Sequence, residues 1–207
     1  MSKRKKSDDK RASIMSAAGE IFLRDGFSAA SMEAIAALAQ VSKATLYSHF
    51  GSKGELFRSV VEARREMAIE AKLHPELLPE DPVSGLQRIA EVFCDLLYSP
   101  EILALYRLIM AEAYRQPELG KIFIEAGPAP THRLVSAYLA RLDRLGKLTV
   151  PDPEQTAELF LGMLRGKGHA LAVLGLPEER PRAKLITAAV EGMVKMCENK
   201  FSLRLLG

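Results

Sequence analysis

The chain has 207 residues, of which 48% are hydrophobic and 27% charged. This balance excludes a disordered or fibrous chain and predicts one globular domain, or a small domain joined to a larger one. No segment approaches the run of about eighteen apolar residues that a membrane helix needs, and the basic start leads into polar residues rather than an apolar secretory segment. We therefore expect a cytoplasmic protein with no membrane partner.

The net charge of +3 is unevenly distributed along the chain. Residues 1–60 carry ten Lys and Arg against six Asp and Glu, whereas residues 61–207 carry nineteen against twenty. A polyanionic partner would therefore meet the N-terminal part. We assign residues 1–7, which include the run Lys3–Lys6, to a flexible basic arm that is either solvated or in contact with the polyanion.

The sequence offers little support for catalysis or for a bound metal. Cys94 and Cys197 lie far apart without a CxxC pattern, so we expect buried thiols rather than a disulfide or a zinc site. The four histidines are scattered, and no hydrolase, zinc-protease or P-loop motif is present. We predict that the protein is not an enzyme and that it has no cofactor and no metal.

Apolar residues recur at helical spacing along nearly the whole chain, and no alternating run is long enough for a strand. We therefore predict an all-α protein of about nine helices. An N-terminal three-helix domain at 8–58 begins with a helix at 8–25, and its last helix runs from Ser52 to about residue 72. Three prolines between residues 75 and 82 exclude a continuous helix and indicate a linker at 73–81. A helical bundle at 82–207 follows, with helices near 82–98, 101–115, 118–145 (bent at Gly127–Pro130), 153–174 and 182–200.

Residues 31–57 have the pattern of a helix-turn-helix. The pattern requires an apolar face on the first helix, a small residue at the crossing, an apolar turn residue and apolar anchors on the second helix. The residues that meet these requirements are Ile35, Leu38, Ala36, Val41, Leu46 and Phe50. The exposed positions of the second helix carry side chains suited to base edges and phosphates, namely Ser42, Lys43, Thr45, Tyr47, Ser48 and His49.

Over about residues 8–58 the chain resembles the DNA-binding domain of the tetracycline-repressor (TetR) family of bacterial regulators. The resemblance rests on Ser31-Met32, Ile35-Ala36, Val41-Ser42-Lys43, Thr45-Leu46-Tyr47, His49-Phe50, Ser52-Lys53 and Leu56-Phe57. Residues 105–165 resemble the C-terminal domain of AefR-like members. Gln40 and Ala44 depart from the family pattern, because both stand where glycine is frequent, and we expect Gln40 to strain the turn slightly or to change its angle.

The resemblance implies a homodimer that binds a palindromic operator in double-stranded DNA. It places Ser42, Lys43 and Thr45 in the major groove. It assigns phosphate contacts to Ser31, Tyr47, His49 and Lys53.

The second domain is expected to bind a small-molecule effector. Its helices carry apolar and aromatic side chains with a few polar tips, as small-molecule pockets do. The candidate ligand-binding residues are Phe93, Tyr106, Met110, Tyr114, Phe123, His132, Met163 and His169. The alternative for each of them is an ordinary place in the hydrophobic core.

The last two helices carry small and apolar residues, and the resembling family implies that such helices pair with their copies in a two-fold four-helix interface. The candidate interface residues are Gly162, Gly166, Leu185, Ile186, Ala189, Val190, Met193, Val194 and Cys197. The alternative is a core within one chain.

Together these features predict a ligand-responsive, sequence-specific DNA-binding repressor. On this hypothesis an effector in the second domain shifts the long helix at 52–72, changes the spacing of the two recognition helices and releases the operator. Two alternatives stay open: an activator of the same fold, and a helical interaction module that does not bind DNA.

Overall fold

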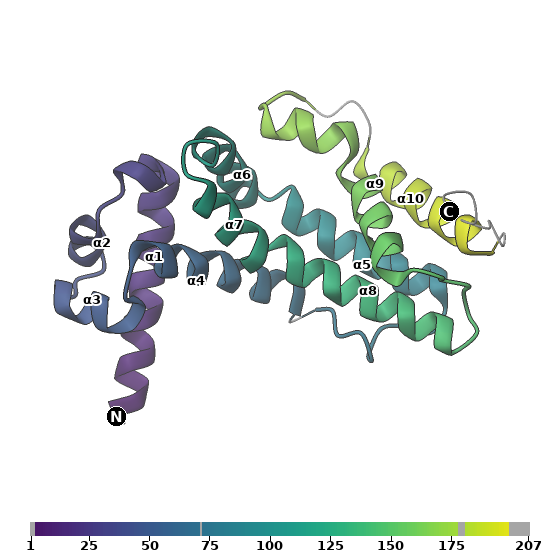
Figure 1. Ribbon diagram of the computed structural model, residues 1–207, viewed down its shortest axis with the longest axis horizontal. Helices are drawn as coiled ribbons and strands as arrows, with labels where there is room; N and C mark the ends of the chain where they lie inside the picture. The colour runs from purple at the N-terminus through teal and green to yellow at the C-terminus, as the bar shows by residue number, and fades with distance from the viewer. Residues whose placement is uncertain (1–2, 71, 178–180, 199–207) are drawn as a thin grey trace. The chain divides into compact units, whose positions relative to one another are not determined.

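The computed structural model describes residues 3–70, 72–177 and 181–198, and the predicted all-α fold is confirmed (Figure 1). In these residues there are ten α-helices, one π-helical turn and no strand, and no helix is long and apolar enough to cross a membrane. The elements are α1 (Lys3–Ala29), α2 (Met32–Leu38), α3 (Lys43–Phe50), α4 (Lys53–Arg65), η1 (Glu66–Glu70), α5 (Pro82–Leu97), α6 (Pro100–Glu112), α7 (Pro117–Ala126), α8 (Pro128–Arg144), α9 (Pro153–Val173) and α10 (Arg182–Glu198).

Three helices differ from the predicted ones. The helix expected from Ser52 to about residue 72 is α-helical only over α4, which ends at Arg65, and the π-helical turn η1 follows it to Glu70. The backbone of residues 3–7 continues α1 instead of forming a flexible arm, because Lys and Arg are good helix formers and no glycine or proline precedes Gly19. The predicted helix at 118–145 is divided into α7 and α8. The chain leaves helical geometry at Gly127, and Pro128 can start a new helix because the first residues of a helix need no backbone N–H donor.

Two helices of the second unit begin at an aspartate cap followed by proline. The Asp81 and Asp152 side chains each accept a hydrogen bond from the backbone N–H three residues further on, at 2.8 and 2.9 Å. These two bonds begin α5 and α9.

The helices group into two compact units. The first combines the residues up to Arg65 with residues 104–128, and so contains α1 to α4, most of α6, and α7. The second contains the remaining described residues. This grouping differs from the predicted division at the linker, because residues 104–128 pack with the N-terminal helices through α4 and α7.

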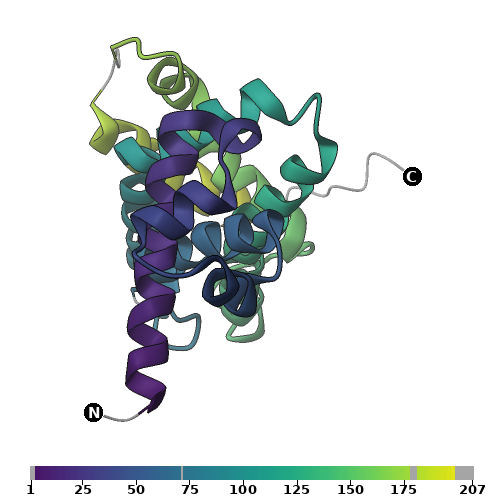
Figure 2. The ribbon, with the colours of Figure 1, turned by 90° about the vertical axis from the view of Figure 1, so that its left-hand side faces the viewer.

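The core of the first unit is centred on three phenylalanines. The rings of Phe22, Phe27 and Phe57 lie with their centroids 5.3 to 5.6 Å apart. Such aromatic clusters bury a large apolar area and prefer these edge and offset contacts. Figure 2 shows α2 and α3 beside α1, and the contacts of α2 with both helices agree with this view.

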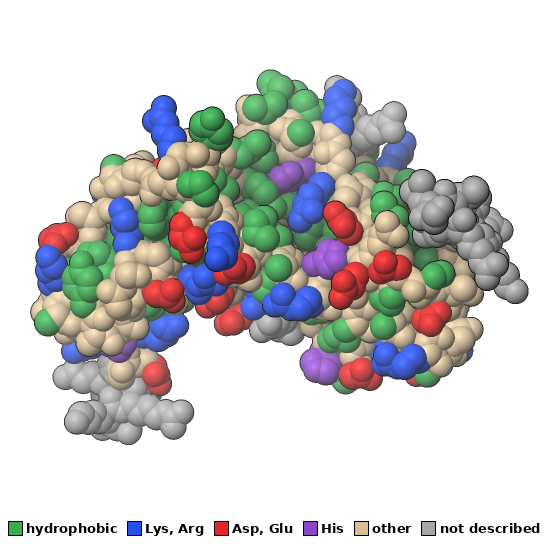
Figure 3. Space-filling view, in the orientation of Figure 1, with side chains coloured by type: hydrophobic (Ala, Val, Ile, Leu, Met, Phe, Trp, Pro, Cys, Tyr) green, Lys and Arg blue, Asp and Glu red, His purple; other side chains and the backbone are tan. Residues whose placement is uncertain are grey.

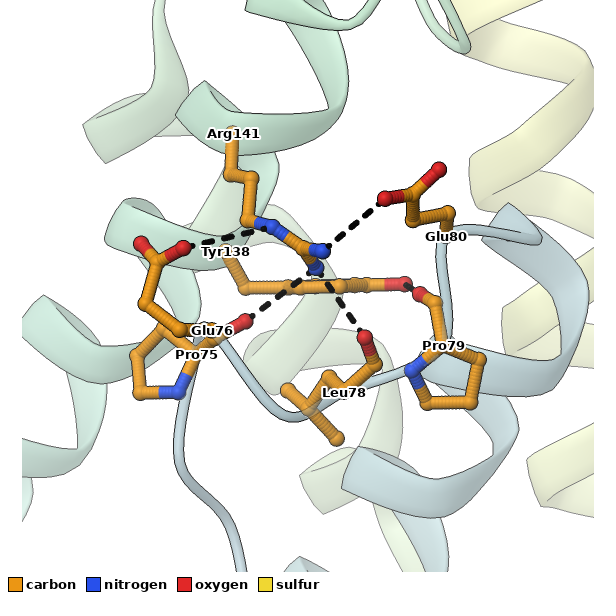
Figure 4. Close-up of polar contacts among 7 residues, drawn as sticks. All are labelled: Pro75, Glu76, Leu78, Pro79, Glu80, Tyr138 and Arg141. Carbon is orange, nitrogen blue, oxygen red and sulfur yellow. Dashed lines mark hydrogen bonds and ion pairs between the residues drawn. The ribbon is translucent and has the colours of Figure 1, made fainter.

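In the second unit, α8 holds the linker through Arg141 (Figure 4). The Arg141 guanidinium donates hydrogen bonds to the carbonyl oxygens of Pro75 and Leu78, at 3.3 and 3.0 Å. It also pairs with Glu76 at 3.5 Å and with Glu80 at 3.3 Å. The proline-rich segment therefore follows a path defined by α8, even though it has no regular secondary structure.

Tyr138, one helical turn before Arg141, completes this attachment. Its hydroxyl donates to the carbonyl oxygen of Pro79 at 2.8 Å, and its side chain is completely buried. Burial raises the pKa of Tyr138 to about 12. A Cβ atom on Gly85 of α5 would lie 1.7 Å from this hydroxyl, so only glycine fits there.

The substitution Tyr138→Phe tests the hydrogen bond to the linker. Because this hydrogen bond between the buried Tyr138 side chain and the Pro79 carbonyl is lost, we expect the free energy of unfolding to fall by about 0.5–1.5 kcal/mol, as measured by chemical denaturation. Tyr114→Phe is the matched control, since Tyr114 is 95% exposed and its loss should change nothing measurable. Equal effects of the two substitutions would contradict the assignment.

Candidate DNA-binding surface

The two helices of the helix-turn-helix begin at serine caps. The Ser31 hydroxyl accepts a hydrogen bond from the backbone N–H of Ala34, and the Ser42 hydroxyl accepts one from that of Thr45, both at 3.1 Å. The Ser42 and Thr45 hydroxyls also lie 2.8 Å apart. Each serine thus orders a helix start in addition to any contact it makes with a partner.

The turn between α2 and α3 takes a shape that favours glycine. The N–H of Val41 donates to the carbonyl of Ala36, and the N–H of Gln40 donates to that of Ala37, which together close a Schellman motif. Gln40 has a φ of 55°, in the left-handed region. The strain expected at Gln40 is therefore present, and it costs about 1–2 kcal/mol for a residue with a Cβ atom.

One face of α3 is buried and the other is open. Leu46 and Phe50 are 0% and 5% exposed, whereas Tyr47 is 41% exposed. Ser42, Lys43 and Ser48 are exposed as well, and Thr45 and His49 are partly exposed. Six of the seven predicted DNA-contacting residues thus lie on α3 or at the caps of α2 and α3, with their side chains at least partly accessible, namely Ser31, Ser42, Lys43, Thr45, Tyr47 and His49.

Lys43 is engaged by an acidic neighbour in the absence of DNA. Its ammonium forms an exposed ion pair with Glu33 of α2 and lies 5.8 Å from the centre of the Tyr47 ring. The hydrogen bond from Lys43 lowers the pKa of Glu33, and the pKa of Lys43 is raised in return. The surface over α2 and α3 mixes basic, acidic and hydrophobic side chains (Figure 3), so a phosphate or a base would compete with Glu33 for this lysine.

The Lys53 ammonium is occupied by backbone carbonyls, which does not fit the predicted phosphate contact. Its ammonium donates to the carbonyl oxygens of Phe27, Ser28 and Ala30 at 2.7, 3.2 and 3.0 Å, and it lies 4.6 Å from the centre of the Phe27 ring. An ammonium has three N–H donors, and all three are used here. Lys53 therefore holds the turn between α1 and α2.

Arg11 is a further candidate for a contact with DNA, and it was not among the residues predicted from the sequence. Its guanidinium lies 4.8 Å from the centre of the Phe50 ring, and its side chain is exposed beside the end of α3. The hydroxyl of Ser13 donates to the carbonyl of Ala39 at 3.1 Å, which fixes α1 against the end of α2. Only this packing brings Arg11 to the surface of α3, and no local pattern in the sequence indicates it.

The predicted ligand-binding residues do not belong to one unit. Phe93, Met163 and His169 lie in the second unit together with His132, and the other four lie in the first. In the first unit the rings of Tyr106 and Phe123 make an edge contact at 5.2 Å. Met110 and Tyr114, by contrast, are 70% and 95% exposed, so the expected single apolar set is not found within either unit.

His132 lines an open groove of about 600 Å³ in the second unit. The groove lies between α8 and the start of α9, and both a basic and an acidic side chain border it. Its lining residues are His132, Arg133, Ser136, Ala137, Ala140, Pro151, Asp152, Pro153 and Glu154.

For six of the predicted interface residues the structure shows the alternative, a core within one chain. α10 packs on α5 and α9, and the residues that this packing buries are Ile186, Ala189, Val190, Met193, Val194 and Cys197. Leu185 is partly exposed, and Gly162 and Gly166 are exposed. The opposite face of α10 carries a shallow depression of about 300 Å³, lined by Ala183, Lys184, Thr187, Ala188 and Glu191.

Comparison with protein-family models gives two matches. The model described as "Bacterial regulatory proteins, tetR family" matches residues 14–60. The model described as "AefR-like transcriptional repressor, C-terminal domain" matches residues 84–200, which is more than half of the chain.

Individual relatives extend these matches. The chain is 34% identical to the HTH-type transcriptional regulator UidR of Escherichia coli strain K12, over 89% of this chain and 92% of that protein. It is 29% identical to the HTH-type transcriptional activator FasR of Mycolicibacterium smegmatis, over 69% of each chain. Among solved structures, the flavonoid-responsive regulator FrrA superposes with a TM-score of 0.73 at 33% identity, over 92% of this chain and 98% of that one.

The two lysines of this region should respond differently to replacement by methionine. Lys53→Met leaves three carbonyl oxygens without their donor, so we expect the free energy of unfolding to fall by about 1–3 kcal/mol. Lys43→Met removes only an exposed ion pair, so stability should be unchanged. Chemical denaturation of both variants measures this difference. A stable Lys53→Met variant would show that the lysine does not hold the turn.

Proposed function

The chain belongs to the TetR family of bacterial regulatory proteins, and we propose that it is a transcriptional repressor that binds a palindromic operator in double-stranded DNA as a homodimer. A small-molecule effector releases it from the operator. The observation that carries the proposal is the exposed polar face of α3, an eight-residue helix anchored by two buried apolar side chains. A helix of this kind fits the major groove of B-form DNA.

The contacts divide into those that read bases and those that hold phosphates. Ser42, Lys43 and Thr45, at the start of α3, face the base edges. Tyr47 and His49 contact phosphates on one side, and Ser31 does so from the start of α2. Arg11 contacts a phosphate in place of Lys53. Its guanidinium lies beside the end of α3, whereas the Lys53 ammonium is bound to the carbonyls of the turn.

The homodimer forms through the outer faces of α9 and α10. Gly162 and Gly166 have open space where a side chain would stand, and a Cβ atom on Gly192 would meet only the Met163 sulfur, at 4.0 Å. Leu159 and Met163 are exposed on the same helix as these two glycines. Small residues beside exposed apolar ones allow two such faces to approach closely across a two-fold axis.

The effector binds among the helices of residues 82–207. The relative FrrA is named a flavonoid-responsive regulator, and it is 33% identical over nearly the whole chain. Flavonoids are therefore the first class of compounds to test. A coupling of about 1–3 kcal/mol between the effector and the operator changes affinity from fivefold to over a hundredfold, which suffices for release.

An activator of the same fold is the second candidate, and FasR is a relative named as an activator. Repression is favoured because the AefR-like repressor model covers residues 84–200. Transcription from the regulated promoter, with and without the protein, separates the two. A helical interaction module that does not bind DNA is the third reading, and it predicts no salt-sensitive binding to any duplex.

Two replacements, Lys43→Met and Arg11→Met, test the DNA-binding proposal. In Lys43→Met the affinity for the operator should fall by about five- to a hundredfold, and the preference for operator over random duplex should fall with it, because a base contact is lost. In Arg11→Met both affinities should fall together, and the slope of log affinity against log salt should flatten by about two, one for each copy of the chain. The operator is first located by footprinting, and fluorescence anisotropy then measures both duplexes.

If the unmodified chain bound operator and random duplex equally, sequence-specific recognition would be excluded. If it bound neither duplex at low salt, the alternative of a helical interaction module that does not bind DNA would be supported instead.

The substitution Ala188→Arg tests the dimer. Ala188 is exposed on the outer face of α10, so a large charged side chain there should convert the dimer to a monomer and sharply weaken operator binding. Ala137→Arg on α8 is the control, because Ala137 is exposed on a different helix. Sedimentation velocity reports the oligomeric state. A dimer that survives Ala188→Arg but not Ala137→Arg would place the interface elsewhere.

A further inference from the structure

The turn that leads into the helix-turn-helix is bound by a carboxylate from a helix far along the chain. The regular part of α1 ends at Gly26, where φ is 82°. The next two backbone N–H groups, of Phe27 and Ser28, donate to the two oxygens of Glu112, at 2.7 and 2.8 Å. The hydroxyl of Ser28 also donates to this carboxylate. Three hydrogen bonds to one ionised group make this a strong attachment.

The turn is shaped to receive this carboxylate. A Cβ atom on Gly26 would lie 2.6 Å from the nearer oxygen of Glu112, so the carboxylate occupies the space of the missing side chain. Four residues after Glu112, the Gln116 side chain donates to the Ser28 hydroxyl and, at 3.4 Å, to Glu112 itself. Glu112 is therefore oriented by its own neighbour as well as by the turn.

The carbonyl groups of the same turn are held from the opposite side. Lys53, at the start of α4, donates to the carbonyls of Phe27, Ser28 and Ala30. The peptide groups of the turn thus lie between a negative charge that accepts from their N–H groups and a positive charge that donates to their oxygens. Ala30 directly precedes Ser31, the cap of α2, so the position of this turn determines where α2 begins.

Glu112 is the last residue of α6, and it lies in the segment that the AefR-like C-terminal model matches. We propose that Glu112 is a positioning residue for operator recognition: its carboxylate holds the turn at 26–30 and so orients α2 and α3 for the major groove. This rests on the proposed DNA-binding function. Holding the reading helices in place before binding reduces the entropy that binding would otherwise lose.

The test is Glu112→Gln in the full chain. Glutamine keeps the shape of the side chain, but it removes the charge and turns one acceptor into a donor that faces an N–H group. Glu125→Gln is the matched control, because Glu125 belongs to the same unit and pairs with Arg58 at 3.0 Å without touching the turn.

Anisotropy with the operator and with a random duplex of equal length separates positioning from general loss of structure. In Glu112→Gln we expect operator affinity to fall about tenfold, within the usual range for coupling between distant sites, while random-duplex affinity stays unchanged. Hydrogen exchange at the amides of Phe27 and Ser28 should become faster. Glu125→Gln should match the unmodified chain in all three measurements.

Two outcomes would overturn the proposal: operator affinity that is unchanged in Glu112→Gln, and equal losses on both duplexes. If Glu112→Gln fails to fold, Ser28→Ala takes its place, since it removes only the hydroxyl donor; a smaller loss confined to the operator supports the proposal, and no loss overturns it. An unmodified chain without operator preference would refute the proposed function and this proposal together. If Glu112→Gln and the unmodified chain prefer the operator over the random duplex to the same degree, only the role of Glu112 is refuted.

Discussion

The anchoring of α3 by two buried side chains is the constraint on which the rest of the structure depends. An eight-residue helix is too short to be stable in water alone, because nucleation costs more than a few backbone hydrogen bonds return. Burial of Leu46 and Phe50 supplies the missing stability, and Ser42 and Gly51 cap the two ends. Since these anchors define the inner face, the polar residues between them necessarily face outward.

Three other helices contribute groups that contact α3 or hold the turn before α2. Arg11 of α1 lies on the Phe50 ring, and Lys53 of α4 holds the carbonyls of the turn before α2. Glu112 of α6 holds the N–H groups of the same turn. The surface proposed to meet DNA is thus formed by a few short helices, but its orientation is set by residues spread over about half of the chain, from Arg11 to Glu112.

Local signals in the sequence were sufficient for most of the helices and for the helix-turn-helix. The caps at Ser31 and Ser42, the helix end at Gly26 and the proline-marked helix starts each depend on residues within one turn, so they could be predicted. The role of Lys53 and the positions of Arg11 and Glu112 could not, because each depends on a partner 23 to 85 residues away or on packing alone. The role of the apolar residues of α10 was ambiguous for a related reason. Helical spacing shows that residues share a face, but not whether the same chain or a second copy covers that face.

The claim that α3 enters the major groove is tested most directly by dimethyl sulfate footprinting of the operator, since this reagent methylates guanine N7 in that groove. If α3 enters the major groove, the protected guanines should form two symmetric clusters whose centres lie about one helical turn, roughly 10 base pairs, or a multiple of it apart. Protection should be absent from a random duplex at the same protein concentration. Guanines that remain fully reactive on a bound operator would contradict major-groove entry, because the exposed face of α3 would then not be the surface that reads DNA.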